Sequence, residues 1–360
     1  MTIAYINQIA TSVPPYDVHH KFNSYAPTLL PDERQQKLFR RMAQRAQIDH
    51  RYSFLEPDET GNGLDRAGFY ASDHFPGTAE RMVVYKQRAF GLVQQALDAL
   101  KPDSDSALKD ITHIITTTCT GFYAPAIDLQ IIKHYGLKQS IERTAIGFMG
   151  CHAAINALQT ARHIVRSNEK ARVLIVNIEL CTLHLQKPNN LEELLSFLIF
   201  ADGCAVSIVS ADRTGIAIDS FNMALVPDTQ GQITWDVGND GFDMVLSGAV
   251  PQTIAENLPR ALPAILNHGS TNDVTHWAVH PGGRTILDAV ETGASLPPEA
   301  LAPSREILRD YGNMSSATVM FVLQKMLSSG SRIDHGCAMA FGPGVAIESM
   351  LFNTVNNGQA

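Results

Sequence analysis

The chain has 360 residues and a formal net charge of -8, with 45% hydrophobic and 18% charged residues. This length allows two core-sized units and the composition is ordinary for a soluble globular protein, whereas the acidic charge disfavours nucleic acid as the main partner. No apolar run is long enough to span a membrane and the N-terminus lacks the pattern of a signal peptide, so we expect a cytoplasmic protein without a membrane span.

The first half of the chain alternates between predicted helices and predicted strands. Helical patterns cover about 31–47, 79–101 and 126–137, and β-rich runs cover 111–121, 171–180, 204–211 and 215–225. The run 171–180 (ARVLIVNIEL) has the near-continuous apolar character of a strand that is buried on both faces.

The second half repeats this order. Predicted helices cover 253–269, 284–293 and both ends of 304–327, a strand covers 276–283, and two strands surround a Gly-Pro-Gly turn within 337–352. No linker rich in proline or serine separates the halves. These observations predict an α/β fold of two closely packed halves, 1–212 and 213–360.

The cysteines do not form a recognisable framework. They are odd in number, widely scattered and without a C-x-x-C pair: Cys119, Cys151, Cys181, Cys204 and Cys337. This pattern argues against a disulfide scaffold and against a cysteine-rich zinc site, and the histidines show no metal-binding spacing. We therefore expect no metal.

Cys151 lies in GFMGCHAA, at a predicted turn from a strand into a helix. A free cysteine is most often a small buried hydrophobe, but a helix N-terminus favours a thiolate. A nucleophile also needs a base or a cationic partner, which His280 in AVHPGGRTI could supply. Asn313 in YGNMSSAT could complete such a site or could simply cap a helix. Taken one at a time, these residues leave both interpretations open.

A basic stripe is predicted on the first helix. Lys37, Arg41 and Arg45 recur at spacings of four residues, which places them on one helical face. Such a stripe is most often a solvated surface. The alternative is a site for a phosphorylated ligand such as coenzyme A, because arginine can bind phosphate in a bidentate manner.

Taken together, five motifs resemble the type III polyketide synthases of the chalcone synthase superfamily in order and spacing: GFMGCHAA, FADGCA, VHPGGRTILDAVE, YGNMSSAT and FGPGVAIE. The resemblance covers most of the chain, and the combination of HPGG, GNMSSA and GPG is highly specific. It implies a thiolase-like fold, in which two pseudo-symmetric halves form a five-layered α-β-α-β-α core, and it implies a homodimer. The half 1–212 would then carry the nucleophilic cysteine, and the half 213–360 the histidine and the asparagine.

The resemblance implies that Cys151, His280 and Asn313 form a catalytic triad. Cys151 and His280 would form a thiolate–imidazolium pair that attacks an acyl-CoA starter. Hydrogen-bond donors of His280 and Asn313 would stabilise the enolate that forms when malonyl-CoA loses CO2. Because this loss generates the carbanion, no cofactor is expected beyond the coenzyme A thioesters that serve as substrates.

Further roles come only from the resemblance. It implies that Phe200, otherwise a candidate core aromatic, is a gatekeeper between the coenzyme A tunnel and the reaction cavity, and that Arg41 and Arg45 contact coenzyme A phosphates. A loop shapes the cavity wall: Gly342, Pro343 and Gly344. The other expected cavity positions are Cys119, Ala124, Cys181, His184, Met244 and Ser315.

Departures from the plant pattern bear on the substrate. Cys119, Cys181 and His184 stand where plant enzymes carry threonine, and Ala124 stands where they have a methionine that reaches into the partner's cavity. IELCTLHLQ resembles bacterial synthases that accept long fatty acyl starters and release alkylpyrones or alkylresorcinols. Trp235 and Met244 would fill part of the cavity. We expect an aliphatic starter and a small apolar tunnel past Ala124 and Cys181.

Three alternatives remain open at this point. The chain could be a β-ketoacyl synthase III-like enzyme that performs a single condensation and uses a carrier protein. It could be a plant-like synthase with a small or aromatic starter. It could also be a catalytically silent acyl-CoA-binding protein, which the presence of all three triad residues disfavours.

Overall fold

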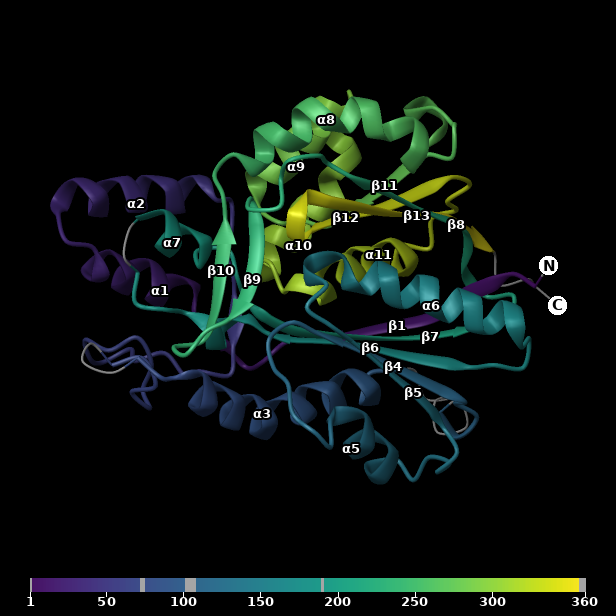
Figure 1. Ribbon diagram of the computed structural model, residues 1–360, viewed down its shortest axis with the longest axis horizontal. Helices are drawn as coiled ribbons and strands as arrows, with labels where there is room; N and C mark the ends of the chain where they lie inside the picture. Colours follow the sequence, from purple (N-terminus) through teal and green to yellow (C-terminus); the bar gives the residue numbers. More distant parts are fainter. Residues whose placement is uncertain (1, 72–74, 101–107, 189–190, 356–360) are drawn as a thin grey trace.

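The computed structural model describes residues 2–71, 75–100, 108–188 and 191–355. Within them lies a mixed sheet of nine strands, in the order β11-β12-β13-β8-β1-β7-β6-β4-β5 (Figure 1). The first half of the chain contributes β1 (Ala4–Ser12), β4 (His113–Thr118), β5 (Glu142–Gly147), β6 (Val173–Leu180) and β7 (Asp202–Ser210). The second half contributes β8 (Gly215–Leu225), β11 (His276–Val279), β12 (Gly336–Gly342) and β13 (Ala346–Val355).

The two halves of the sheet share one pattern of pairing. In the first half, β1, β7 and β6 pair antiparallel in succession, and β6 pairs parallel with β4. In the second half, β8, β13 and β12 pair antiparallel in succession, and β12 pairs parallel with β11. The halves join where residues 4–6 of β1 pair with residues 216–218 of β8. This repeat gives the sheet its pseudo-symmetry.

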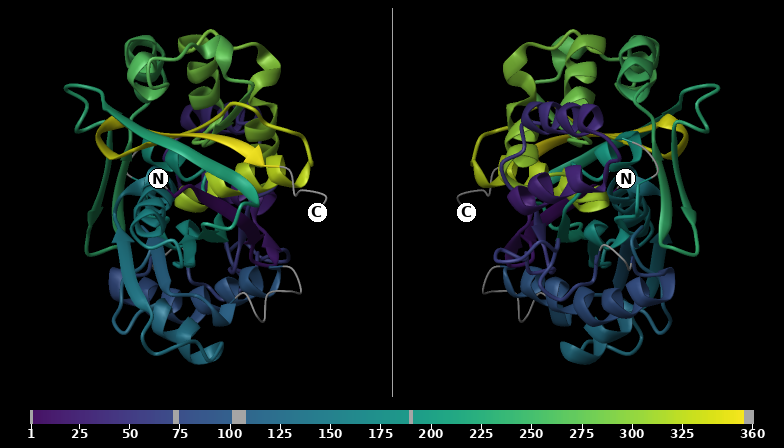
Figure 2. Two further views of the ribbon diagram at one scale, coloured as in Figure 1. Left: turned by 90° about the vertical axis from the view of Figure 1, so that its right-hand side faces the viewer. Right: turned by 90° about the vertical axis from the view of Figure 1, so that its left-hand side faces the viewer.

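Helices complete five layers. The central layer, between the two halves of the sheet, holds α6 (Ala153–Ser167) and α11 (Thr318–Ser328) (Figures 1 and 2). One outer layer holds α3 (Thr78–Asp98) and α5 (Ile127–His134). The other holds α8 (Val250–Ile265) and α9 (Arg284–Gly293), and α10 (Ala302–Tyr311) packs against both α9 and α11. The thiolase-like α-β-α-β-α arrangement expected from the sequence is therefore confirmed.

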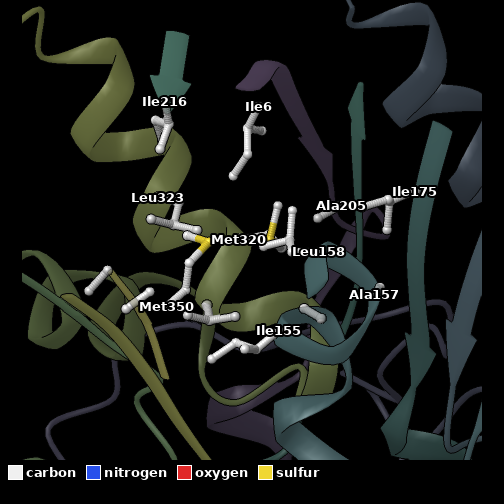
Figure 3. Close-up of a cluster of buried hydrophobic side chains, with 14 of the residues drawn as sticks. Ile6, Ile155, Ala157, Leu158, Ile175, Ala205, Ile216, Met320, Leu323 and Met350 are labelled. Atoms are coloured by element: carbon white, nitrogen blue, oxygen red, sulfur yellow. The ribbon is translucent and has the colours of Figure 1, made fainter. Parts of the chain in front are cut away.

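The central layer is packed by side chains from both halves. Ile155 and Leu158 of α6 lie in one buried cluster with Met320 of α11, Ile6 of β1 and Met350 of β13 (Figure 3). Each large apolar side chain that is fully buried contributes about 1.5–3 kcal/mol relative to exposure. A helix held in this way from both sides provides a rigid base for the residues at its N-terminus.

The predicted helices and strands are found, with ends shifted by a few residues. The helix predicted over 253–269 begins at Val250 and ends at Ile265. The interruption of 304–327 predicted at Gly312 and Asn313 follows the end of α10, and the 3-10 turn Ser315–Ala317 then leads into α11. The predicted end of helix 79–101, residue 101, lies outside the described residues, and α3 ends at Asp98.

Peripheral elements complete the structure. They are the hairpin of β9 (Ile233–Val237) and β10 (Phe242–Leu246), the short pair β2 (Tyr16–Asp17) and β3 (Tyr52–Ser53), and the helices α1 (His19–Tyr25), α2 (Glu33–Arg45) and α7 (Leu191–Ser196). Of these elements, α2 was predicted from the sequence and the others were not, and β1 and β5 were not predicted either. No helix in the described parts of the chain is both long and apolar enough to cross a membrane.

Candidate active site

A cavity of about 80 Å³ lies where elements of both halves meet. Its walls are mostly apolar, and the hairpin β9–β10 closes one side with Ile233, Trp235 and Met244. Eleven residues that were predicted from the sequence line this cavity: Cys119, Cys151, Cys181, Phe200, Trp235, Met244, His280, Asn313, Ser315, Gly342 and Pro343. The fold therefore brings together the three proposed catalytic residues and most of the proposed cavity residues.

Cys151 lies in a 3-10 turn, Gly150–His152, directly before α6. Gly150 has a φ of +71°, and a Cβ atom there would lie 2.5 Å from Cδ of Pro343. Only glycine allows both this conformation and this close approach. The glycine therefore lets the 342–344 loop press against the turn that carries the cysteine.

The sulfur of Cys151 points toward a second turn at the start of α11. Sγ of Cys151 lies 3.8 Å from Oγ of Ser315. Ser315 has a φ of +48°, in the left-handed region that residues other than glycine seldom adopt. Strained backbone of this kind is concentrated at functional sites, where the surrounding structure holds it in place.

His280 and Asn313 present hydrogen-bond donors to the same part of the cavity. His280 is 1% exposed, and neither of its ring nitrogens has a hydrogen-bond partner among the described residues. Oδ1 of Asn313 accepts a 2.8 Å hydrogen bond from the backbone N–H of Ser315, which leaves Nδ2 near the carbonyl of Gly282, at 3.4 Å. A Cβ atom on Gly282 would lie 3.7 Å from Nε2 of His280. Both donors thus lie beside Gly282, where they could bind one oxygen.

Burial opposes both charges of the expected thiolate–imidazolium pair. Burial raises the pKa of the Cys151 thiol to about 12, against a smaller lowering by its hydrogen bonds to Ser315 and Asn313. Burial also lowers the pKa of His280 to about 3, and a nearby histidine, His152, adds to this effect. A buried apolar site disfavours both charges when neither group is paired. Burial by itself therefore favours the neutral thiol and the neutral imidazole.

Phe200 separates the main cavity from a second, smaller one. Phe200 and Cys181 line both cavities, and the second has a volume of about 40 Å³. Its other walls come from residues between 18 and 70 and between 182 and 197 and are largely apolar, with Phe22, Leu55 and Phe197 among them. Phe200 was predicted to lie between the coenzyme A tunnel and the reaction cavity. In the structure it lies at the boundary between the main cavity and this inner cavity.

An open groove of about 450 Å³ leads from the surface to the main cavity. The groove and the cavity share four lining residues: Leu246, Val250, Gly282 and Ile286. Met42 and Arg45 of α2 line its outer end. Arg41 does not line the groove and is exposed one turn earlier on the same helix.

Three predicted residues do not line the cavity: Ala124, His184 and Gly344. The cavity assignment of His184 is wrong. Its Nε2 lies 2.8 Å from the carbonyl of Thr120, its Nδ1 accepts from the backbone N–H of Phe242, and its ring stacks on that of Phe242. Ala124 is exposed, and the carbonyl of Gly344 accepts from Oγ1 of Thr229 in the loop next to the cavity.

Glu179 is a buried acid of this region that the sequence analysis missed. Its Oε2 accepts hydrogen bonds from the N–H of Cys119 and from Oγ1 of Thr120, and its Oε1 accepts one of 2.6 Å from Ser316. Burial raises the pKa of Glu179 to about 7. The carboxyl group therefore ties the ends of β4 and β6 to the turn at the start of α11. The signal was a glutamate within an otherwise apolar strand, because such residues are almost never buried unless paired.

In the described parts of the chain, no three histidine, cysteine or acidic side chains are grouped so that they could hold a metal ion.

The two halves of the chain match two family models. Residues 9–213 match the N-terminal domain of chalcone and stilbene synthases, and residues 217–356 match the C-terminal domain of the same proteins. The alpha-pyrone synthesis polyketide synthase-like Pks18 of Mycobacterium tuberculosis is 30% identical over 98% of this chain and 92% of its own length. The bisdemethoxycurcumin synthase of Oryza sativa is 34% identical over 69% of this chain and 67% of its own length.

Solved structures of the same kind have the same fold. The 1,3,6,8-tetrahydroxynaphthalene synthase of Streptomyces coelicolor, a bacterial type III polyketide synthase, superposes with a TM-score of 0.87 at 27% identity, over 97% of this chain and 99% of its own. The C-terminal type III domain of Steely1 from Dictyostelium superposes with a TM-score of 0.89, over 98% of this chain and 99% of its own. At 24% identity, the second comparison concerns the fold alone.

Proposed function

The chain belongs to the chalcone and stilbene synthase family and is a type III polyketide synthase, and on this premise we propose that it makes an alkylpyrone or an alkylresorcinol. In this proposal an acyl-CoA starter is loaded on Cys151. Successive decarboxylative condensations with malonyl-CoA then extend the chain, and the product is released by cyclisation.

The catalytic roles are supported by the placement of three residues around one cavity. Sγ of Cys151 attacks the starter thioester, and His280 accepts the thiol proton, because no other group in the described parts of the chain binds its ring nitrogens. Coenzyme A leaves as the thiol. Nε2 of His280 and Nδ2 of Asn313 then bind the thioester oxygen of malonyl-CoA, where negative charge develops as the C–C bond to CO2 breaks. The enolate carbon attacks the acyl-cysteine and regenerates the Cys151 sulfur.

An aliphatic starter is supported by the inner cavity. The alkyl chain on Cys151 would pass between Cys181 and Phe200 into apolar space. Ala124 lines neither cavity, so the tunnel proposed from the sequence would pass Cys181 only. The name of the relative Pks18 refers to alpha-pyrone synthesis, which agrees with this type of product.

The small volume of the main cavity favours a second candidate. Trp235 and Met244 face each other across the hairpin β9–β10 and line the cavity, whose volume is about 80 Å³. A cavity this small would limit the number of extensions. A small or aromatic starter, or a single condensation of the β-ketoacyl synthase III type, is therefore the alternative.

A homodimer is supported by the edge of the sheet at β5. Most residues of β5 are exposed, and none of the described strands pairs with its outer row of backbone groups. Phe122 and Met149 are 45% and 38% exposed, and a Cβ atom on Gly147 of β5 would lie 2.5 Å from the ring of Phe122. Pairing with a second copy would cover this strand and the exposed apolar side chains beside it. Cytoplasmic location stays a prediction.

One assay tests the activity and separates the candidates. The purified protein is given malonyl-CoA and acyl-CoA starters of increasing chain length, and products are identified by mass spectrometry. We expect pyrones or resorcinols from long-chain starters with the wild type and none with Cys151→Ala, while Cys337→Ala, a buried cysteine away from the cavity, should retain activity. Product formation by Cys151→Ala at the wild-type rate would exclude covalent loading on this residue.

A further inference from the structure

Helix α2 carries an exposed stripe in which cations and apolar side chains alternate. Arg34, Arg41 and Arg45 lie on one side of the helix, at successive spacings of seven and four residues, and Leu38 and Met42 lie among them. Leu38 is 44% exposed and Met42 is 41% exposed. These five residues are called the α2 stripe below.

The charges of the α2 stripe are not neutralised locally. The ion pair that α2 makes within the described part of the chain joins Lys37 to Glu33, at 3.3 Å, and leaves the three arginines of the stripe without an acidic partner. The whole chain has a net charge of -8. An unpaired cationic surface on an acidic protein attracts an acidic partner.

The stripe begins at the groove and extends beyond it. Met42 and Arg45 line the outer end of the groove that leads to Cys151. Arg34 lies eleven residues earlier, about 16 Å along the helix axis. Helix α2 lies at the outside of the molecule, beyond α1 and α7 (Figures 1 and 2). A partner that covered the whole stripe would therefore be a macromolecule placed at the mouth of the groove.

We infer that the α2 stripe docks a small acidic acyl carrier protein, which delivers the starter through the groove. This inference rests on the proposed function, because a carrier protein and coenzyme A present the acyl group on the same phosphopantetheine arm. The sulfur of Cys151 attacks the thioester carbonyl, the bond from the acyl carbon to the arm's sulfur breaks, and the arm leaves as a thiol with the cysteine's proton. Acidic side chains of the carrier complement the arginines, and Leu38 and Met42 supply the apolar centre of the contact.

A membrane surface is the weaker partner for this stripe. An interfacial helix buries a continuous apolar face in the headgroup region. The α2 stripe offers only two large apolar side chains, Leu38 and Met42, among three arginines. The α2 stripe also lies beside the groove. This position suits a carrier protein, because its phosphopantetheine arm must enter the groove.

The test delivers one acyl group in two ways. The starters are dodecanoyl-CoA and the dodecanoyl form of a bacterial fatty-acid-synthase carrier protein, each with malonyl-CoA, and kcat/KM is obtained for the starter by mass spectrometry of the product. The variants are Arg34→Glu and Leu38→Asp, neither of which lines the groove. Arg40→Glu is the matched control, because this exposed arginine lies about 200° around the helix from Leu38.

We expect both stripe variants to lower kcat/KM for the carrier-borne starter on the order of tenfold and to change that for dodecanoyl-CoA less than about twofold. Arg40→Glu should leave both values near wild type. Equal effects on both starters, or a wild type that does not use the carrier-borne starter, would overturn the inference. So would binding to anionic phospholipid vesicles that both variants abolish while carrier kinetics stay unchanged. Failure of the wild type with every acyl-CoA would instead overturn the proposed function itself.

Discussion

Arg51 donates a 2.8 Å hydrogen bond from Nη1 to the backbone carbonyl of Phe200. The same nitrogen donates to the carbonyl of Phe197, and Arg51 is only 2% exposed. Phe200 in turn pairs with Asn313 through backbone hydrogen bonds, in which the N–H of Asn313 donates to the carbonyl of residue 199 and the carbonyl of Asn313 accepts from Ala201. The buried guanidinium of Arg51 therefore supports the segment around Phe200. This segment forms the boundary between the two cavities and binds the backbone of Asn313.

Replacement of Arg51 should slow the decarboxylation of malonyl-CoA more than the loading of Cys151 by the starter. Lysine at this position keeps the charge but cannot reproduce the planar set of donors. We expect Arg51→Lys to slow malonyl-CoA decarboxylation on the order of tenfold, because loss of a hydrogen bond to a charged group costs about 1.5–3 kcal/mol and Asn313 would lose its support. Release of CoA on loading of Cys151 by the starter should change much less.

Two measurements test this prediction: the release of CO2 from malonyl-CoA, and the single-turnover burst of CoA from an acyl-CoA alone. Arg66→Lys is the matched control, since Arg66 is exposed and pairs only with Glu56 among the described residues. A parallel fall of both steps in Arg51→Lys would show a general loss of structure and contradict a positioning role toward Asn313.

Substitution of Cys181 should shorten the accepted starter. Cys181 is 4% exposed and lines both the main and the inner cavity, so a phenyl ring in its place would close the passage between them. We expect Cys181→Phe to lower kcat/KM for long-chain acyl-CoA at least tenfold relative to short-chain acyl-CoA, because several buried methylene groups at about 0.8 kcal/mol each would lose their site.

Ala124→Phe is the comparison, since Ala124 is exposed and lines neither cavity. Product distributions over a chain-length series measure both variants. If Ala124→Phe shortens the profile and Cys181→Phe does not, the alkyl chain passes elsewhere, and the inner cavity has no part in starter binding.

The features that were predicted correctly from the sequence are those with a strong local signal. The continuous apolar run of β6 and the glycine-bordered motifs of Cys151 and His280 are local signals, and the structure places them as expected. The strand β5 was missed because its sequence, ERTAIG, is largely polar, as suits an exposed edge. The hairpin β9–β10 was missed for a similar reason, since its short runs carry aspartates.

The sequence does not predict which residues, distant along the chain, come together in the folded protein. The inner cavity combines residues from position 18 to position 200, which no local pattern relates. His184 occupies a position expected to face the cavity, but the 3-10 turn Cys181–His184 directs its ring to Thr120 and Phe242 instead. The effect of burial on the pKa values of Cys151 and His280 is likewise a property of the folded protein, which a motif does not report.

The protonation state of Cys151 can be measured by alkylation. Burial raises the pKa of its thiol to about 12, so the rate of reaction with iodoacetamide should increase about tenfold per pH unit from pH 7 to pH 10 without a plateau. Peptide mass spectrometry assigns the modified residue. Ser315→Ala should lower the rate a few-fold, because the Ser315 hydroxyl stabilises the thiolate. A rate that is already constant between pH 6 and pH 8 would instead establish a thiolate–imidazolium pair.

Glu179 should make stability depend on pH in a defined direction. Burial raises its pKa from 4.5 to about 7, so the folded state holds this proton more tightly than the unfolded state does. The stabilisation from that proton is fully present below about pH 4.5 and is lost as the pH rises to about 7. The size is about 3 kcal/mol, at about 1.36 kcal/mol per pKa unit.

Glu179→Gln removes this dependence and keeps most of the geometry. The amide oxygen can accept from Cys119 and Thr120, and the amide NH2 can donate to Ser316. The free energy of unfolding of the variant, relative to wild type, should therefore rise between pH 5 and pH 8 in urea titrations. The exposed Glu299→Gln is the matched control and should show no such rise. A variant that becomes relatively less stable toward pH 8 would show that the ionised carboxylate, rather than the protonated acid, stabilises the fold.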